Sequence, residues 1–394
     1  LRLRWASAGW GKINTVREML AEFKKSKKFI YAYSEAYNEK LYYLATVADR
    51  IYMYPKGEFS WDGLDMQSTF FQKTFAKLEV EPTLVRAGRF KAAGESFIKD
   101  KMSEENKIQS REIINNLWSY IEQQIVASRP KLTPELLSQW AGQVTVTNAQ
   151  EAYGQGLVDV LAPIEEIDLL FRKMTKTKPK DELPLISWDS YYDSQKSSLG
   201  FMESAKVAVI VADGEIQMGS GPEDQAIYSD ALATLIRKVA KDDDVKSVVL
   251  RINSPGGSAL ASDVIWRSLE FLKKKKPVVS TFSDVAASGG YYIAAGSQYI
   301  YADPMTITGS IGVFGLMFNT HKFFDNKLGV TFDGVKTHTS ADMMSGVRAL
   351  TPYELQVVQR SVDDIYHTFL SVVKEGRSQF EDLQAVKEIA EGRV

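Results

Sequence analysis

Ser288 has surroundings that suit a nucleophile. It stands in the stretch SDVAASGGYYIAA, residues 283–295, between two alanines and two glycines and directly before an apolar run. Small neighbours would let a substrate carbonyl approach the hydroxyl, and the N–H of Gly289 at a helix start could stabilise an oxyanion. The same small residues would also suit close packing of a helix on a sheet. This stretch alone leaves both interpretations open.

A second glycine-rich loop could supply backbone donors to the same cleft. The stretch RINSPGGSALASD, residues 251–263, places two glycines between the end of a strand and the start of a helix. Gly256 and Gly257 can adopt positive φ and leave N–H groups directed at a substrate strand or an oxyanion. Ser-Pro-Gly-Gly is also common in ordinary turns. The loop therefore indicates an active site only in combination with other residues.

A serine nucleophile needs a base, and histidine is the usual one. The chain has three histidines, His321, His338 and His367. No aspartate is placed persuasively to orient any of them, so a Ser-His-Asp triad is not favoured. Cysteine is absent, which excludes thiolate nucleophiles, disulfides and cysteine metal sites.

Lysine can replace histidine as the base if burial lowers its pKa from about 10.4 to near 7 or 8, at a cost on the order of 4 kcal/mol. Lys91, in the stretch VRAGRFKAAGESF, is flanked by Phe90 and two alanines, and Arg89 is near enough in sequence to add a second positive charge. Lysine is abundant in this chain. These neighbours therefore do not identify the base by themselves.

The elements that would position these residues occur twice along the chain. Residues 27–55 align with residues from 275 onward, so that Ser34 meets Ser283 and the pair Tyr42-Tyr43 meets Tyr291-Tyr292. Two apolar stripes with spacings of 3, 4 and 7 correspond farther along and predict amphipathic helices. The stripes are Ile114, Leu117, Trp118, Ile121 and Ile125 in the first copy and Val362, Ile365, Tyr366, Phe369 and Val373 in the second. A capping-box sequence, residues 351–354, is expected to open the second helix.

The second copy predicts an α/β fold. Strands are expected at Lys206–Val211, Val248–Ile252 and Val278–Phe282, and helices at Tyr228–Ala240 and Ala259–Leu272. Short strands that alternate with helices indicate a mostly parallel sheet covered by helices, with functional loops at the carboxyl ends of the strands. We expect the third strand to break at Ser283-Asp284, before the Ser288 stretch.

Domain boundaries follow from the repeat. We expect an N-terminal repeat over residues 1–174, a linker over residues 175–200 that mixes Lys, Asp, Pro and Ser without a period, and a C-terminal repeat over residues 201–394. Leu1-Arg2-Leu3 aligns with Leu250-Arg251-Ile252. The first copy is therefore expected to begin inside a strand, and the second to stop before its own last elements.

Bulk properties narrow the classes of partner. The net charge is −2 and the pI is about 6.1, which gives no basic surface for nucleic acid. No apolar run approaches the roughly 20 residues that a membrane-spanning helix needs. A leader or membrane anchor is therefore expected outside this sequence, if the protein has one.

Five stretches together carry a resemblance to a known family: INSPGGS, SDVAASGGYYIA, TITGSIGV, RAGRFKAAGESF and GQGLVD. With these motifs, the chain resembles the signal peptide peptidase A (protease IV) family in its tandem-repeat form, over essentially its whole length. The resemblance implies two tandem repeats of the crotonase-like fold shared with Clp protease. It also implies serine peptide hydrolysis by a Ser/Lys dyad, with cleaved signal peptides and other hydrophobic segments as substrates.

The resemblance implies roles for individual residues. Ser288 would be the nucleophile, Lys91 the general base, and Ser310 the serine that helps to hold the lysine amine. Oxyanion donors would come from Gly289 and from the Gly256-Gly257 pair, without a choice between those two. The resemblance further implies no metal or cofactor, a homo-oligomer that is commonly tetrameric, and a bacterial inner-membrane location with the catalytic part facing the periplasm. A plastid homologue would have the same features.

The repeat alignment tests the dyad independently. Glu39 stands opposite Ser288, and Ala341 stands opposite Lys91. The first copy therefore keeps the lysine and the second keeps the serine, so we expect one dyad per chain, assembled from both copies. Two other classes remain as alternatives, a crotonase-fold acyl-CoA enzyme and a non-catalytic peptide-binding scaffold.

Overall fold

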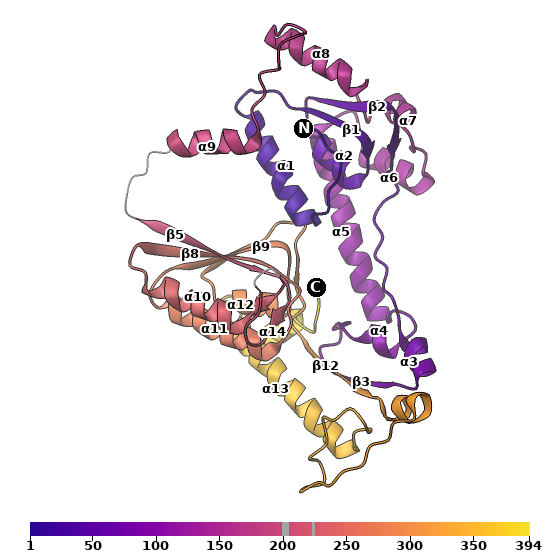
Figure 1. Cartoon of the computed structure of the whole chain (residues 1–394), viewed down its shortest axis with the longest axis vertical. Helices are drawn as coiled ribbons and strands as arrows, with labels where there is room; N and C mark the ends of the chain where they lie inside the picture. The colour runs from indigo at the N-terminus through magenta and orange to yellow at the C-terminus, as the bar shows by residue number, and fades with distance from the viewer. Residues whose placement is uncertain (199–204, 223–224) are drawn as a thin grey trace. The chain divides into compact units, whose positions relative to one another are not determined.

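The structure, a computed structural model, describes residues 1–198, 205–222 and 225–394 (Figure 1). The chain divides into two compact units. Unit 1 comprises Leu1–Leu64 and Leu117–Ala205, and unit 2 comprises Asp65–Asn116 and Lys206–Val394. The expected boundaries at 174 and 201 follow the sequence repeat and stay a prediction. Residues 199–204, around the end of the expected linker, lie outside the described residues.

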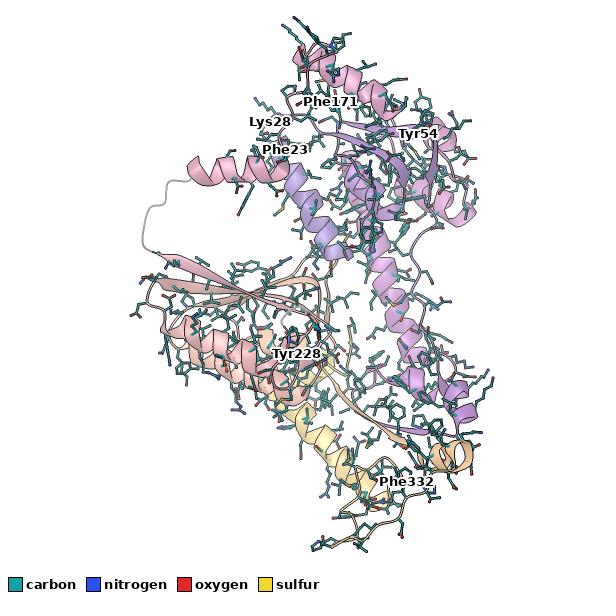
Figure 2. All side chains as sticks on the ribbon, in the orientation of Figure 1. Phe23, Lys28, Tyr54, Phe171, Tyr228 and Phe332 are labelled. Atoms are coloured by element: carbon teal, nitrogen blue, oxygen red, sulfur yellow. The ribbon has the colours of Figure 1, made fainter. Side chains whose placement is uncertain are left out.

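Unit 1 is built on a three-stranded parallel sheet with the strand order β1-β2-β4. Its elements are α1 (Trp10–Lys24), β1 (Tyr31–Tyr37), α2 (Glu39–Ala45), β2 (Arg50–Phe59), residues 117–128 of α5 (Glu104–Ser128), α6 (Pro134–Gln143), α7 (Ala149–Gly154), β4 (Val160–Leu161), α8 (Ile164–Thr175) and α9 (Trp188–Ser198). One apolar cluster on this sheet includes buried Tyr33 and Tyr52. Phe171 of α8 (Figure 2) stacks on Tyr31 beside this cluster, with 6.2 Å between ring centroids.

Unit 2 is built on a larger parallel sheet with the strand order β10-β9-β8-β5, and β11 also pairs with β9. Its elements are α3 (Gln72–Leu78), β3 (Glu81–Ala87), α4 (Glu95–Ile98), the start of α5, β5 (Lys206–Asp213), β6 (Ile216–Gln217), β7 (Ile227–Tyr228), α10 (Ser229–Lys241), β8 (Val245–Ser254), α11 (Ala259–Lys273), β9 (Val278–Ala287), α12 (Gly289–Ala294), β10 (Tyr299–Tyr301), β11 (Ile307–Gly309), β12 (Val313–Asn319), the π-helix η1 (Phe323–Leu328), α13 (Pro352–Gly376) and α14 (Leu383–Ile389). The predicted α/β class with parallel sheets is confirmed.

Helices cover one face of the unit 2 sheet. Figure 1 shows α10 and α11 along this face, where Ile236, Leu250 and Ile265 are fully buried in one apolar cluster. The opposite face is only partly covered, because Val207, Val209 and Val211 of β5 are about 60% exposed. The prediction of a sheet covered by helices therefore holds for one face of this edge strand.

The predicted elements of the second copy are confirmed, with one correction. The expected break at Ser283-Asp284 is wrong, because β9 continues to Ala287. Its second half finds a different partner: Val285 pairs with Ile307 and Ala287 with Gly309 of β11. The strand therefore delivers its last residue directly to Ser288.

Residues 81–87 join unit 2 through an antiparallel pair. Strand β3 pairs with β12 over its full length, with Ala87 opposite Val313. Helix α13 packs beside this pair, and Val362, Phe369 and Val373 of its predicted stripe are buried there. The predicted capping box is present at the start of α13. This packing holds the segment after β3 against the end of β9.

One further expectation needs adjustment, and one stays a prediction. The expected linker is not entirely irregular, since α9 occupies its second half and the Ser187 hydroxyl accepts the Ser190 N–H at the helix start. The alignment of Glu39 with Ser288 stays a prediction: α2 and α12 end 249 positions apart, at Ala45 and Ala294, whereas their first residues, Glu39 and Gly289, are 250 apart. Neither Glu39 nor Asn38, the residue before it, is a serine. Among the described helices, none is long and apolar enough to cross a bilayer.

Candidate active site

Ser288 occupies a sharp turn between a strand and a helix. Strand β9 ends at Ala287 and α12 begins at Gly289, with Ser288 at φ 53° and ψ −119°. A residue with a side chain rarely adopts this conformation, which costs on the order of 1–3 kcal/mol. The turn is fixed on both sides, because the Ser288 N–H donates to the Gly309 carbonyl at 2.9 Å and its carbonyl accepts from Tyr292 at 2.9 Å. The strained turn is therefore held in place from both β11 and α12.

Lys91 meets Ser288 in the interior of unit 2. The side chain is 3% exposed, and its Nζ lies 3.0 Å from Ser288 Oγ. The same nitrogen lies 2.9 Å from the Ser310 carbonyl oxygen and 3.0 Å from Ser310 Oγ. The structure thus brings together Ser288, Lys91 and Ser310, which the family resemblance assigned to one site.

These three contacts match a neutral amine. Such an amine has two N–H donors and one lone pair. The two oxygens of Ser310 can accept both N–H groups, which leaves the lone pair for the hydroxyl proton of Ser288. Burial favours the uncharged form and lowers the pKa of Lys91 to about 8. The arrangement can therefore take a proton from Ser288 near neutral pH.

The expected help from Arg89 is not found. Its guanidinium is exposed and pairs with Glu105 at 3.2 Å, and burial alone lowers the pKa of Lys91. The two residues follow each other closely in the chain, but the turn after β3 sends their side chains to different environments. The pKa of Lys91 is therefore lowered by its low-dielectric surroundings and not by a neighbouring cation.

Ser310 reaches the site through strand register. Gly309, the last residue of β11, pairs with Ala287, the last residue of β9, so the next residues of both strands lie side by side. Ser310 has φ 52°, which turns the chain so that both of its oxygens face Lys91. Parallel pairing explains why two serines far apart in sequence share one amine.

The two glycines of the Gly256-Gly257 pair are not equivalent. The Gly256 N–H already donates to Ser254 Oγ at 3.1 Å, whereas the Gly257 N–H has no partner among the described residues. A Cβ placed at Gly256 would lie 2.7 Å from the Gly289 nitrogen, so the loop passes tightly over the start of α12. The first N–H groups of a helix lack intrahelical partners. Gly257 and Gly289 are therefore the candidates for donors beside Ser288.

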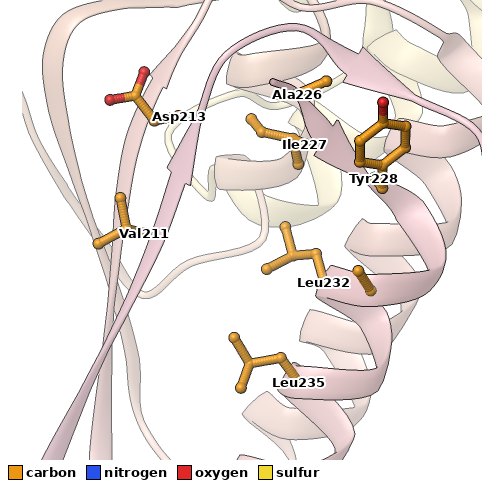
Figure 3. A pocket seen from close by; sticks show the side chains of 8 residues that line it. Val211, Asp213, Ala226, Ile227, Tyr228, Leu232 and Leu235 are labelled. Atoms are coloured by element: carbon orange, nitrogen blue, oxygen red, sulfur yellow. The ribbon is translucent and has the colours of Figure 1, made fainter. Parts of the chain in front are cut away.

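A pocket of about 300 Å³ opens beside the dyad. Lys91, Ser288 and Gly289 line one end, and the remaining wall is mainly apolar, with Tyr292, Val313, Phe314, Val362, Ile365 and Phe369. A second pocket of about 280 Å³ lies between β5 and α10, where Figure 3 shows Val211 and Asp213 facing Leu232 and Leu235. This second pocket contains neither dyad residue. The first pocket is the one that joins apolar binding surface to reactive groups.

The three histidines take no part in this site. His321, His338 and His367 are all exposed, and none of the hydrogen bonds in the described structure joins any of them to Ser288. This agrees with the expectation that a Ser-His-Asp triad is not formed.

Sequence reasoning missed an ion pair that supports the lysine loop. Arg86 Nη1 donates to the Lys91 carbonyl and to Glu95 Oε1, both at 3.2 Å. Glu95 is 2% exposed and also accepts from the Ser103 hydroxyl at 3.0 Å. Burial would raise the pKa of Glu95, but hydrogen bonds from Ser103 and Arg86 and the charge of Lys99 lower it below its usual value. The sequence feature that could have indicated this ion pair is the presence of Arg86 and Glu95 within a stretch rich in Ala and Gly.

Replacing Glu95 with alanine is expected to lower the free energy of unfolding by about 1–3 kcal/mol, because Arg86 and Ser103 would lose their buried acceptor. Urea unfolding measures this change. Lys99→Ala is the matched control, since Lys99 is partly exposed and its amine lies 3.6 Å from the same carboxylate; its effect should stay below about 0.5 kcal/mol. Equal losses in both variants would contradict a supporting role for the buried acceptor.

The fold and site define a class before any relative is considered: an α/β protein with a buried lysine bonded to a strained serine beside free backbone N–H groups, as in a serine hydrolase with a lysine base. The sequence profile of Peptidase family S49 matches residues 22–178 and 270–394. The chain belongs to this family of serine proteases, and the two matches agree with the predicted tandem repeat. The Clp protease profile matches residues 203–304, in line with the predicted Clp-like fold.

Individual relatives agree with this assignment. The chain is 31% identical over 396 residues to "Serine protease SPPA, chloroplastic" of Arabidopsis thaliana, covering 98% of this chain and 57% of that protein. It is 34% identical over 387 residues to "Protease 4" of Haemophilus influenzae, covering 95% and 62%. A "Putative signal peptide peptidase SppA" of Enterococcus faecium is 41% identical over 162 residues, covering 41% and 46%. The chain thus spans about three fifths of the length of the Arabidopsis and Haemophilus relatives. The solved structure of a ClpP1 mutant from Listeria monocytogenes overlaps 46% of this chain and 77% of its own with a TM-score of 0.28 and 12% identity, too little to carry an argument.

Proposed function

We propose that this protein is a serine endopeptidase that hydrolyses hydrophobic peptide segments, including the remnants of cleaved signal peptides, with Ser288 as nucleophile and Lys91 as general base. One observation carries the proposal: a buried lysine amine lies 3.0 Å from the hydroxyl of a serine on a strained turn. Membership of Peptidase family S49 supports the reaction class. The printed name of the Enterococcus relative supports the substrate class.

The contacts support a two-step mechanism. Neutral Lys91 takes the Ser288 proton as the oxygen attacks the peptide carbonyl, and returns it to the leaving amine. The Gly257 and Gly289 N–H groups stabilise the oxyanion of the tetrahedral intermediate. Ser310 holds the amine through both of its oxygens, so that the same group can activate water for deacylation.

The pocket supports an apolar substrate. Its wall offers aromatic and aliphatic side chains next to Ser288, and no charged side chain other than Lys91 lines it among the described residues. A substrate side chain that fills this pocket would displace water from around Lys91, which favours the neutral amine. The base and the binding surface therefore favour the same peptides.

Assembly and location follow from the resemblance alone. We propose a homo-oligomer, most simply a tetramer, that associates with a membrane through a segment outside this sequence. For a bacterial source the proposed place is the inner membrane, with the active site facing the periplasm, whereas the Arabidopsis relative is a chloroplastic protein by its name.

The pH dependence of hydrolysis tests the proposed base. Below its pKa of about 8 Lys91 is protonated and cannot accept the serine proton, so kcat/KM on an internally quenched apolar peptide should rise with pH and level off above about pH 9. The value at pH 6 should be about a hundredfold below the plateau. An acylating serine-hydrolase probe should label Ser288 with the same midpoint.

Four results would count against the proposal. A flat profile between pH 6 and pH 10 would exclude a base with this pKa, and label on another serine would exclude this nucleophile. Binding of the peptide without cleavage or label would favour the peptide-binding scaffold, while CoA binding without label would favour the acyl-CoA enzyme.

A further inference from the structure

The segment Glu391–Gly392–Arg393, which follows α14, contacts the loop that carries Lys91. The Glu391 carbonyl accepts the Phe90 N–H at 2.7 Å, and the Glu391 carboxylate accepts the Arg89 N–H at 3.0 Å. The Arg393 guanidinium lies over the Phe90 ring, 4.6 Å from its centroid. Residues some 300 positions apart in the chain therefore fix the backbone on the N-terminal side of the lysine.

The same three residues also hold the loop that carries Ser310. The Ser310 N–H donates to the Arg393 carbonyl at 2.5 Å, and the Gly392 N–H donates to the Ile311 carbonyl at 2.9 Å. The segment thus bonds through its backbone to both loops whose side chains meet at the Lys91 amine. Its outer end is tied to α13, because the Glu391 N–H donates to the Tyr366 hydroxyl at 3.3 Å.

The backbone of Lys91 lies so close to residue 392 that only glycine fits at this position. Gly392 has φ +75° and is buried, and a Cβ on it would lie 2.5 Å from the Lys91 nitrogen and 2.7 Å from its Cα and Cβ. Three more glycines, Gly88, Gly309 and Gly312, meet the segment at distances where a Cβ would lie within 3.0 Å of its backbone. At these glycines the backbone of the segment therefore lies directly against the backbone of the two loops.

We propose that residues 391–393 are a positioning segment for catalysis, which sets the place of the Lys91 amine between Ser310 and Ser288 and keeps water away from it. The inference rests on the proposed function of Lys91 as the base. None of the three residues contacts the reacting atoms, so their effect passes through Lys91 and Ser310.

Among the residues that the structure describes, no ionisable group near Lys91 bonds to its amine, so the segment can affect Lys91 only through the burial of that amine. The ionisable groups on the elements packed against Lys91 are Arg86, Glu95, Tyr292, Tyr366, Glu391 and Arg393. In the described structure, none of them bonds to the Lys91 amine, whose partners are Ser288 and Ser310. A shift of the lysine backbone would therefore act by admitting water and lengthening these contacts.

Gly392→Ala in the full chain tests the proposal. The added Cβ must push Lys91 outward, so we expect kcat/KM on the apolar peptide to fall about a hundredfold. The titration midpoint of Lys91 should rise by about one pH unit toward the ordinary value near 10.4. NMR of lysine labelled with ¹³C at Cε reports this midpoint without any need for turnover, and Lys91→Arg assigns the signal. Gly142→Ala is the matched control, because a Cβ at Gly142 would meet no atom within 4 Å, and it should leave both values unchanged.

A milder variant covers the case in which Gly392→Ala does not fold. Glu391→Gln keeps the backbone bonds but weakens the acceptor for the Arg89 N–H, and should lower kcat/KM several-fold with a smaller upward shift of the midpoint. Unchanged rate and unchanged midpoint in the folded variants would overturn the inference. A wild-type protein with a low Lys91 midpoint but no peptidase activity would instead overturn the proposed function, while the effect of Gly392→Ala on the midpoint would still support the segment's role.

Discussion

Replacing Ser288 with alanine is expected to lower peptide turnover by at least about 10⁴-fold and to remove labelling by the acylating probe. The hydroxyl is the atom that forms the acyl-enzyme, and no other described serine lies within hydrogen-bond reach of the Lys91 amine except Ser310, whose oxygens hold that amine. The backbone strain at φ 53° is the same for alanine, so the free energy of unfolding should change by less than about 1 kcal/mol. Quenched-peptide kinetics and urea unfolding of the same sample separate the two effects.

Ser268→Ala is the matched control for that experiment. Ser268 is also a buried serine of unit 2, with its hydroxyl donating to the Val264 carbonyl at 3.1 Å, but it lies in the middle of α11. Its loss should leave turnover within about twofold of wild type. A Ser288→Ala variant that retained turnover would show that backbone N–H groups alone perform the chemistry, as the acyl-CoA alternative requires.

Replacing Lys91 with methionine is expected to lower kcat/KM by at least about 10³-fold while making the protein more stable at pH 7. The folded state binds the Lys91 proton with a pKa of about 8, whereas the unfolded chain binds it with a pKa near 10.5. Below pH 8 folding therefore carries a full penalty of about 3 kcal/mol for the buried charge. Between pH 8 and 10.5 this penalty fades as the folded lysine loses its proton first. Methionine removes this penalty but leaves both oxygens of Ser310 without their donor, so the net gain at pH 7 should be below about 3 kcal/mol, and above pH 10.5 the variant should be less stable than wild type.

Lys276→Met distinguishes this result from a general effect of removing a buried lysine. Lys276 is 8% exposed, and its amine donates to the Val239 carbonyl at 2.8 Å and to the Asp242 carbonyl. Its loss leaves these acceptors unpaired and should destabilise the protein with no change in kcat. A Lys91→Met variant that was active, or that was destabilised at pH 7 as much as Lys276→Met, would contradict the buried-base assignment.

The strands, the long helices and the turn at Ser288 could be predicted from the sequence because each has a local pattern. Alternating β-branched runs predicted β5, β8 and β9, and spacings of 3 and 4 predicted α13 together with its capping box. The end of β9 was misplaced because the pairing of residues 285–287 with β11 depends on a partner twenty residues farther on. Such long-range pairing leaves no mark in a local pattern.

The site was predictable only in part, for related reasons. Lys91 could be proposed from its apolar neighbours and the resemblance, but the proximity of Arg89 in sequence was misleading because a turn separates the two side chains. The choice of Gly257 over Gly256 depends on one hydrogen bond to Ser254. Nothing in the local sequence pointed to Glu391 and Gly392, since their contacts with the lysine loop join residues about 300 positions apart.

The chain passes between the two units three times, at residues 64–65, 116–117 and 205–206. Lys91 lies in the segment Asp65–Asn116, which belongs to unit 2 although the chain on either side of it belongs to unit 1. Base and nucleophile are therefore held together by packing between β3 and β12 and not by the peptide bonds that lie between them. A break in the backbone between α8 and α9 would leave Lys91 and Ser288 on separate polypeptides that still share one folded unit. In this topology, we expect proteolytic nicking of the linker to yield a two-chain protein in which Lys91 and Ser288 stay together.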